Sequence, residues 1–460
     1  MSVATDASVR SAIGLLSAWI ESQLASSGVP GLSIGVVHDQ ELIWSAGFGR
    51  ARVEPAQPAT PDTLYRIASI TKLFTSTAIL QLRDAGKLRL DDPLVEHLPW
   101  FRIRQAHADA PAITIRHLLT HTAGLPREAG FPYWTDGVFP TAEQVRERLA
   151  EQQTALPAET EWKYSNLGLT LAGEIVAAVS GRPYPEYVAE WILEPLGMRR
   201  TFVATPPTDH PDLATGYTRR LPGAGRAVAP STDSRGITPA ANMTTSVSDL
   251  ARFARLQFRD GPAGGSQILR GSTLREMQRV HWLEPDWAAG RGLGFRVTRL
   301  AGRTYVGHGG SLRGYRTQLE LCPADRVAVI VMTNADDGNP MAVVEKVYQW
   351  VAPAIRQAAP PPAPPGPPAG WERYAGRYRN AWHDLQVLVV DGRLAMLDPS
   401  LPDPLPFVIW LHPVAEHTFR SETKNGFGTN AEPVVFDVDG AGRVRRLTIG
   451  ENSLEPVAQW

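Results

Sequence analysis

The residues best suited to chemistry are Ser69 and Lys72, which stand three positions apart in Ser69-Ile70-Thr71-Lys72. A strand-like run, 63–67, precedes them, and a helical run extends from Ser69 to about Ala85. Residues three apart share one face of a helix, so we expect the lysine amine near the serine hydroxyl. The first helical turn also offers free N–H groups to a developing anion. This combination predicts acyl transfer.

A second copy of the same spacing occurs at Ser421-Glu422-Thr423-Lys424. The turn dipeptide Asn425-Gly426 follows it, in a region that reads as short strands. Because no helix start accompanies Ser421, we interpret this match as coincidence and Ser69 as the nucleophile.

Two further segments carry side chains or backbone suited to a cleft. Tyr164-Ser165-Asn166 immediately precedes the helical run 167–180, and a phenol and an amide two positions apart in such a loop can face the same cavity. His308-Gly309-Gly310-Ser311 is predicted at a strand edge. Its two glycines would let the backbone approach a ligand closely.

In this order, Ser-x-x-Lys, Tyr-x-Asn and His-x-Gly, the three segments resemble the motifs of the serine β-lactamase-like superfamily. That superfamily includes class C β-lactamases, D-amino-acid peptidases and family VIII carboxylesterases. The segments 115–125 and 249–253 are similar to it as well, so the resemblance covers about residues 8–355. The segment 371–378 resembles the start of a lipocalin-like barrel that is appended to some peptidases of this superfamily.

The resemblance implies a role for each matched residue. Ser69 would be the acylated nucleophile, and Lys72 and Tyr164 would share proton transfer, with the identity of the base left open. Asn166 would hold either the substrate amide or the Lys72 amine. The backbone N–H groups of Ser69 and Ser311 would form the oxyanion hole.

The third segment departs from the pattern of β-lactamases and cell-wall carboxypeptidases, which usually have Lys-Thr-Gly where this chain has His308-Gly309-Gly310. A lysine is cationic at neutral pH, whereas a histidine is mostly neutral. A substrate carboxylate would be held less firmly, unless Arg313 or Arg316 holds it. The substitution favours esters and peptides over β-lactams.

Other side chains leave alternatives open. His117 and His121 have the i, i+4 spacing of a zinc pair, but the sequence shows no third ligand or glutamate base nearby, which favours packing. Four aromatic residues in an interrupted segment form either a pocket rim or a loop packed on the core: Phe131, Tyr133, Trp134 and Phe139.

Composition excludes several classes of protein. The 46 basic and 47 acidic residues give a net charge of −1, which offers no long-range field for nucleic acid or an anionic membrane. The single cysteine, Cys322, excludes an internal disulfide. We expect no cofactor and no metal. Residues 1–23 lack the pattern of a signal peptide, and no run approaches the ~18 apolar residues of a membrane helix, so we expect a cytoplasmic protein without membrane association.

The proline-rich stretch 358–370 divides the chain. We predict a hydrolase domain at 1–357, an extended linker at 358–370, and a lipocalin-like domain at 371–460. In the first domain, helical patterns include 7–27 and 341–351, and strand patterns include 31–37, 41–49 and 327–333. Strands at both ends with helices between them predict an α+β (mixed α/β) fold, with an antiparallel sheet flanked by helices and a mostly helical subdomain. After residue 371, short alternating runs predict a small antiparallel β-barrel, at 386–390, 393–397, 407–411, 434–438 and 444–449.

The sequence therefore favours a serine hydrolase that acts through an acyl-enzyme on amide or ester bonds. It would be a peptidase, with D-amino-acid specificity as one option, or a carboxylesterase. Its partners would be a small molecule or short peptide, and a second copy of the chain. The alternatives are a β-lactamase or penicillin-binding protein and a non-catalytic scaffold of the same fold.

Overall fold

The computed structural model describes residues 2–262, 264–359, 370–423, 426 and 428–457. These residues form two compact units, 1–359 and 360–460, which are described separately. Most of the predicted linker, 360–369, lies outside the described residues, while Ala358 still belongs to a helix. The division into an independent hydrolase domain, linker and barrel domain stays a prediction.

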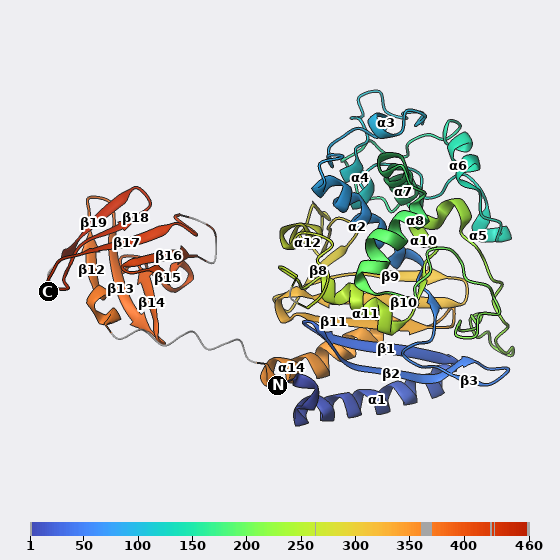
Figure 1. Cartoon of the computed structure of the whole chain (residues 1–460), viewed down its shortest axis with the longest axis horizontal. Helices are drawn as coiled ribbons and strands as arrows, with labels where there is room; N and C mark the ends of the chain where they lie inside the picture. The colour runs from blue at the N-terminus through green and yellow to red at the C-terminus, as the bar shows by residue number, and fades with distance from the viewer. Residues whose placement is uncertain (1, 263, 360–369, 424–425, 427, 458–460) are drawn as a thin grey trace. The chain divides into compact units, whose positions relative to one another are not determined.

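The first unit is built on one antiparallel sheet of nine strands among its described residues (Figure 1). In spatial order the strands are β3 (Gln57–Pro58), β2 (Glu41–Arg52), β1 (Gly31–His38), β11 (Val327–Thr333), β10 (Tyr315–Cys322), β9 (Arg303–Leu312), β8 (Arg296–Leu300), β7 (Ala289–Arg291) and β6 (Trp282–Leu283). Leu32 of β1 pairs with Thr333 of β11, so the two ends of the unit meet at the centre of the sheet. The predicted sheet of distant segments is confirmed.

Side-chain alternation along β11 explains why helices cover both faces of the sheet. Val327, Val329 and Val331 pack into one apolar cluster, while Ala328, Ile330 and Met332 pack into the other. Successive strand residues point to opposite faces, so a strand that is apolar throughout must be buried on both.

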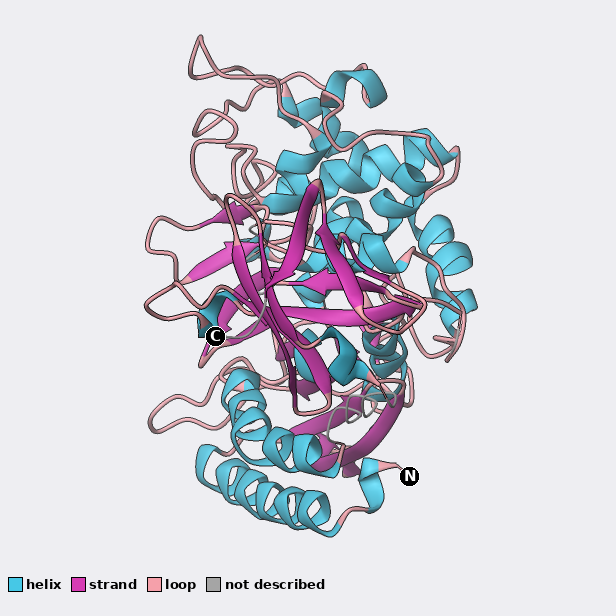
Figure 2. Cartoon of the chain, turned by 90° about the vertical axis from the view of Figure 1, so that its left-hand side faces the viewer, coloured by secondary structure: helices cyan, strands magenta, loops and turns pink. Residues whose placement is uncertain are grey.

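Two helices from opposite ends of the unit cover one face. α1 (Ala7–Ser27) begins at the Asp6 cap and ends at Gly28, whose φ is 66°. α13 (Pro340–Lys346), a π-helical turn (Val347–Val351) and α14 (Ala352–Ala358) complete this layer, so the helix predicted at 341–351 is longer than expected. Figure 2 shows the helix pair near the N-terminus lying side by side.

The other face is covered by the helical subdomain, which lies above the sheet in Figure 1. Its main helices are α2 (Thr71–Asp84), α7 (Asn166–Ser180), α11 (Val247–Leu256) and α12 (Gly271–Gln278). Shorter helices complete it: α3 (Leu94–His97), α4 (Ile115–Thr120), α5 (Tyr133–Asp136), α6 (Ala142–Leu149), α8 (Tyr184–Val188), α9 (Glu194–Leu196) and α10 (Thr238–Ala241). A small separate ladder pairs β4 (Tyr65–Arg66) with β5 (Thr244–Thr245).

The second unit is a closed barrel of eight antiparallel strands, which confirms the predicted barrel. The strands are β12 (Gly376–Arg379), β13 (Asp384–Val390), β14 (Arg393–Leu397), β15 (Ile409–Ala415), β16 (Thr418–Glu422), β17 (Pro433–Val438), β18 (Val444–Ile449) and β19 (Asn452–Val457). Its interior is filled by its own apolar side chains, among them Trp371, Phe419 and Phe436.

Within the described ranges, none of the helices combines the length and apolar character needed to cross a lipid bilayer.

Candidate active site

Ser69 sits in a short 3-10 turn, Ala68–Ile70, between β4 and α2. The α-helix begins at Thr71, so the expected helix start at Ser69 is wrong by two residues. Ala68 has a φ of 47°, an unusual conformation for a residue with a side chain. This turn lifts Ser69 out of the core: it is the one residue between Thr63 and Leu80 that is not buried.

Two polar groups converge on the Ser69 hydroxyl. Lys72 Nζ lies 3.1 Å from Ser69 Oγ, and Tyr164 Oη lies 2.9 Å from the same oxygen. Lys72 is fully buried, and its amine also contacts Asn166 Oδ1 and the Ala240 carbonyl oxygen, each at 2.8 Å. The structure therefore brings together all three residues that the sequence assigned to the chemistry.

Burial shifts the protonation of both neighbours of Ser69. Burial lowers the pKa of Lys72 well below the ordinary lysine value, with a raising contribution from Glu128 and a lowering one from Arg127. Burial raises the pKa of Tyr164 to about 12, against a lowering contribution from its bond to Ser69. Near neutral pH the tyrosine is therefore a neutral phenol that can donate, and the neutral amine form of the lysine is accessible.

The His308–Ser311 segment lies on the half of β9 that pairs only with β10, because β8 pairs with residues 303–307 of β9. A Cβ atom at Gly310 would stand 2.2 Å from the Ile67 carbonyl oxygen and 2.2 Å from Thr317 Oγ1. The missing side chain thus lets β9 lie directly against the turn that carries Ser69. In this arrangement Gly310 is needed for close packing of the protein on itself.

His308 does not replace the positive charge of a lysine. Its Nδ1 lies 2.7 Å from the Gly309 carbonyl oxygen, and its ring centroid lies 6.3 Å from that of Tyr164. Burial, with a further contribution from Lys72, lowers the pKa of His308. The ring is therefore neutral near neutral pH, as the sequence comparison with lysine suggested.

The cleft around Ser69 has a volume of about 670 Å³. Six of the seven predicted site residues line it, and Lys72 reaches Ser69 from the buried side. The lining residues are Ser69, Arg127, Trp134, Trp162, Tyr164, Asn166, Ala241, His308, Gly309, Gly310, Ser311, Arg316, Thr317, Gln318 and Pro340.

The arginines near the cleft differ in their positions. Arg316 lines it, although its guanidinium also donates to the carbonyl oxygens of Leu312 and Tyr315. Arg313 is not among the lining residues and donates instead to two carbonyl oxygens of α5. Arg127, which the sequence did not single out, lines the cleft with its guanidinium carbon 5.0 Å from the centroid of the Tyr164 ring.

The aromatic segment divides between the two alternatives left open by the sequence. Trp134 lines the cleft and is 38% exposed, whereas Tyr133 and Phe139 are each 1% exposed and stack at 4.6 Å. Phe131 packs against the core. Trp134 therefore forms part of the cleft rim, and the other three aromatic residues pack in or against the core.

The two histidines considered for zinc have structural partners. His117 and Thr114 cap the start of α4 reciprocally, and His121 Nδ1 accepts the backbone N–H of Ser165 at 3.1 Å. Elsewhere among the described residues, the side chains of Asp92, Glu96 and His97 lie close enough together to hold a metal ion. This cluster includes neither His117 nor His121.

Sequence reasoning missed Glu128 and Trp162. Both carboxylate oxygens of Glu128 accept hydrogen bonds from Asn166 Nδ2, at 3.0 and 3.1 Å. The guanidinium carbon of Arg291 lies 3.8 Å from the centroid of the Trp162 ring. Glu128 lies in a loop, and no periodicity or spacing relates it to the three motifs. Tertiary structure alone brings it to the site.

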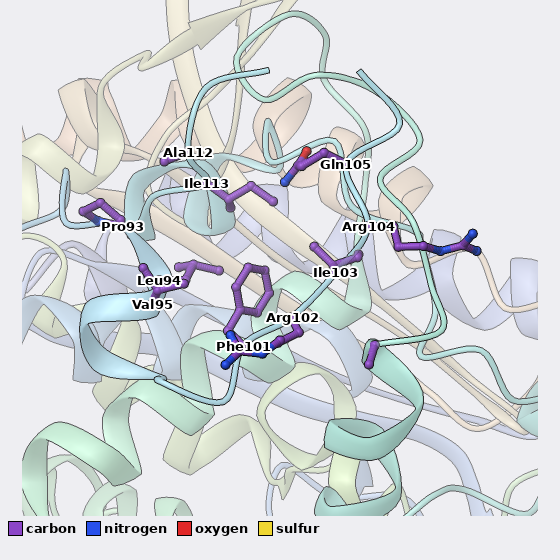
Figure 3. Close-up of a pocket in the computed structure, with 11 residues that line it drawn as sticks. Pro93, Leu94, Val95, Phe101, Arg102, Ile103, Arg104, Gln105, Ala112 and Ile113 are labelled. Atoms are coloured by element: carbon purple, nitrogen blue, oxygen red, sulfur yellow. The ribbon is translucent and has the colours of Figure 1, made fainter. Parts of the chain in front are cut away.

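A second hollow, of about 530 Å³, lies elsewhere in the first unit (Figure 3). Phe101, Ile103, Leu94 and Ile113 give it a largely apolar wall. None of the predicted site residues lines it.

Comparisons with known proteins found relatives in sequence and in fold. The chain is similar to "Beta-lactamase-like protein 2" of Dictyostelium discoideum, with 31% identity over 310 residues, 66% of this chain and 55% of the relative. The chain spans about half the length of the curated relatives that it matches. Among solved structures, an octameric penicillin-binding protein homologue from Pyrococcus abyssi superposes with a TM-score of 0.66 and 25% identity, covering 96% of this chain and 99% of that one.

A D-stereospecific amidohydrolase from Streptomyces sp. superposes with a TM-score of 0.60 and 25% identity, over 72% of this chain and 97% of that one. The Beta-lactamase family model matches residues 16–354, which include every predicted site residue. The chain therefore belongs to the beta-lactamase family of hydrolase folds.

Proposed function

We propose that the protein is a serine hydrolase that cleaves ester or amide bonds through an acyl-enzyme on Ser69. The observation that supports this most strongly is the convergence of Lys72 Nζ and Tyr164 Oη on Ser69 Oγ, at 3.1 and 2.9 Å, at the wall of an open cleft. A nucleophile within hydrogen-bond reach of a base is the arrangement that acyl transfer requires.

Lys72 is the better candidate for the base. A neutral amine has two N–H groups, and Asn166 Oδ1 and the Ala240 carbonyl oxygen can accept both. The remaining lone pair then faces Ser69 Oγ. Tyr164, whose pKa is raised to about 12, is the complementary proton donor.

In the proposed reaction, Lys72 takes the Ser69 proton while Oγ forms a bond to the substrate carbonyl carbon. The carbonyl π electrons move to oxygen, where the N–H groups of Ser69 and Ser311 are proposed to stabilise the charge. Collapse breaks the bond to the leaving alcohol or amine, which receives a proton through Tyr164 and Lys72. Water then attacks the acyl-enzyme and restores Ser69.

The cleft favours uncharged or weakly anionic acyl donors. His308 supplies no cation, so anion recognition would depend on two arginines that line the cleft: Arg127, and Arg316, whose guanidinium also donates to two carbonyl oxygens. Esters and peptides, including D-configured peptides, therefore fit better than β-lactams. The similarity to a D-stereospecific amidohydrolase supports the peptide option, and a carboxylesterase is the other.

A β-lactamase or penicillin-binding activity and a non-catalytic scaffold are the competing functions. The first would need a firm carboxylate anchor in the cleft. The second leaves unexplained why a buried lysine and a half-buried tyrosine meet at one partly exposed serine, since burying a lysine is costly.

The test uses the full-length chain with a panel of p-nitrophenyl esters, D-amino-acid amides and a cephalosporin. Ser69→Ala should abolish turnover of every substrate that the wild type accepts. The matched control is Ser421→Ala, because Ser421 has the same sequence spacing but lies on β16 of the barrel. Equal activity in wild type and Ser69→Ala would refute the proposal.

The location and the assembly of the protein are further parts of the proposal. We retain a cytoplasmic location, which cell fractionation can test. Self-association is proposed because the homologue from Pyrococcus abyssi, which this chain covers over 99% of its length, is octameric. Light scattering on the full-length chain measures it directly.

A further inference from the structure

Glu128 lies one contact away from the residues that meet at Ser69. Both of its carboxylate oxygens accept from Asn166 Nδ2, at 3.0 and 3.1 Å. Its carboxylate also accepts a hydrogen bond from the Tyr133 hydroxyl, and its Oε1 lies 3.1 Å from Arg127 Nε. Its side chain is 20% exposed, so these contacts are partly shielded from water.

These contacts determine how the Asn166 amide is oriented. With Nδ2 held by the carboxylate, Oδ1 faces Lys72 Nζ at 2.8 Å. A flipped amide would direct its oxygen at the Glu128 carboxylate and its N–H groups at the lysine amine. Both contacts would then be repulsive, because an ionised carboxylate only accepts and a lysine mainly donates.

The same carboxylate also acts on the protonation of Lys72. Burial lowers the pKa of Lys72, and the negative charge of Glu128 raises it, which opposes the effect of burial. A base works best when its pKa lies near the working pH, and loss of this charge would make the lysine a weaker base. The other titratable or charged groups around Lys72 are Arg127, Tyr164, His121 and His308.

We propose that Glu128 is a positioning residue, which orients the Asn166 amide toward Lys72 and places a negative charge one side chain away from the lysine that activates Ser69. The inference rests on the proposed hydrolase function for its purpose. The effect on Lys72 exists whether or not the chain turns over any substrate.

The chain has five lysines, Lys72, Lys87, Lys163, Lys346 and Lys424, so ¹³Cε-lysine labelling gives a spectrum simple enough to titrate in the full-length protein. The Lys72 signal is assigned by its loss in Lys72→Arg. Glu128→Gln should move the Lys72 titration midpoint to lower pH, because the neutral amide no longer stabilises the ammonium ion. An unchanged or higher midpoint would overturn the proposal.

Glu174→Gln is the matched control, since Glu174 lies on α7 with Asn166, has a 14% exposed side chain and pairs with Arg146. Its Lys72 midpoint should equal that of the wild type. Glu128→Asp keeps the charge but shortens the reach, so its midpoint should lie between those of wild type and Glu128→Gln. A Glu128→Asp midpoint at or above the wild-type value would contradict the proposal even if Glu128→Gln does not fold.

Kinetics with p-nitrophenyl butyrate provide the second readout. Loss of amide positioning in Glu128→Gln should lower the plateau of kcat/KM by between about 10- and 100-fold, as expected for misplaced catalytic groups. The acidic limb of its pH profile should move to lower pH with the Lys72 midpoint. If the wild type has no esterase or amidase activity but the Lys72 midpoint still moves in Glu128→Gln, the result would support the role of Glu128. It would refute the hydrolase proposal instead.

Discussion

Gly310→Ala should impair the protein through a steric clash beside Ser69. The new Cβ atom would stand 2.2 Å from the Ile67 carbonyl oxygen and from Thr317 Oγ1, about 1.2 Å closer than the 3.4 Å at which ordinary contact begins. Ile67 O belongs to the backbone that leads into the Ser69 turn, and Thr317 Oγ1 donates to it at 3.3 Å. Relief of the clash therefore requires β9 and the Ser69 turn to separate by roughly an ångström.

Two effects follow from that separation. Overpacking should lower the free energy of unfolding by about 1–3 kcal/mol. A shift of this size between nucleophile and oxyanion donors should lower kcat/KM about 100-fold. Thermal melting followed by circular dichroism measures the first, and p-nitrophenyl ester hydrolysis measures the second.

Gly309→Ala is the neighbouring comparison on the same strand. Neither glycine has a positive φ, so the backbone cost of the two substitutions is similar. The atom nearest to a Cβ at Gly309 is Gln318 Oε1 at 2.8 Å, the end of a flexible side chain that can move. Gly309→Ala should thus lose far less activity, and equal kinetics and melting in Gly310→Ala and wild type would refute the packing argument.

Lys72→Ala, Tyr164→Phe and the double variant should all lose most of kcat, without multiplicative losses, because the two side chains act on one oxygen. Independent, multiplicative losses would indicate separate roles. Since His308 is neutral, kcat/KM should be higher for a short ester or a D-configured peptide than for a cephalosporin, and the reverse order would contradict the assigned substrate class. Truncation after Ala359 should leave a folded unit that hydrolyses small esters, whereas a cut at Val351 should unfold it because Ile355 is buried. An unfolded 1–359 fragment would show that the barrel is needed for stability.

The fold was largely accessible from the sequence because its main elements have strong local patterns. The apolar run 327–333 predicted a strand, and the helical spacing of residues 7–27 predicted a helix that the structure has with the same bounds. Three barrel strands were not predicted, at 376–379, 418–422 and 452–457, and the first of them has only four residues. Four residues are too few for a two-residue period to stand out, and its pairing with β13 and β19 comes from tertiary structure.

Part of the site was accessible from spacing alone, and the resemblance to a family supplied Tyr164, Asn166 and the 308–311 segment. Ser69 and Lys72 share a turn, so their spacing alone predicts their contact. The positive φ of Ala68 could not be predicted, because alanine gives no sign of a left-handed conformation. Glu128 was invisible for another reason: its contact with Asn166 spans 38 residues, and a glutamate in a polar loop is usually a solvated surface residue.

The central claim is that Ser69 becomes acylated, and peptide mapping by mass spectrometry tests it most directly. The full-length protein is mixed briefly with p-nitrophenyl butyrate, quenched in acid and digested. A butyryl mass increment should appear on Ser69, and it should be absent from Ser69→Ala but present in Ser421→Ala. Turnover of the ester with the increment on another residue, or an undiminished increment in Ser69→Ala, would contradict the account.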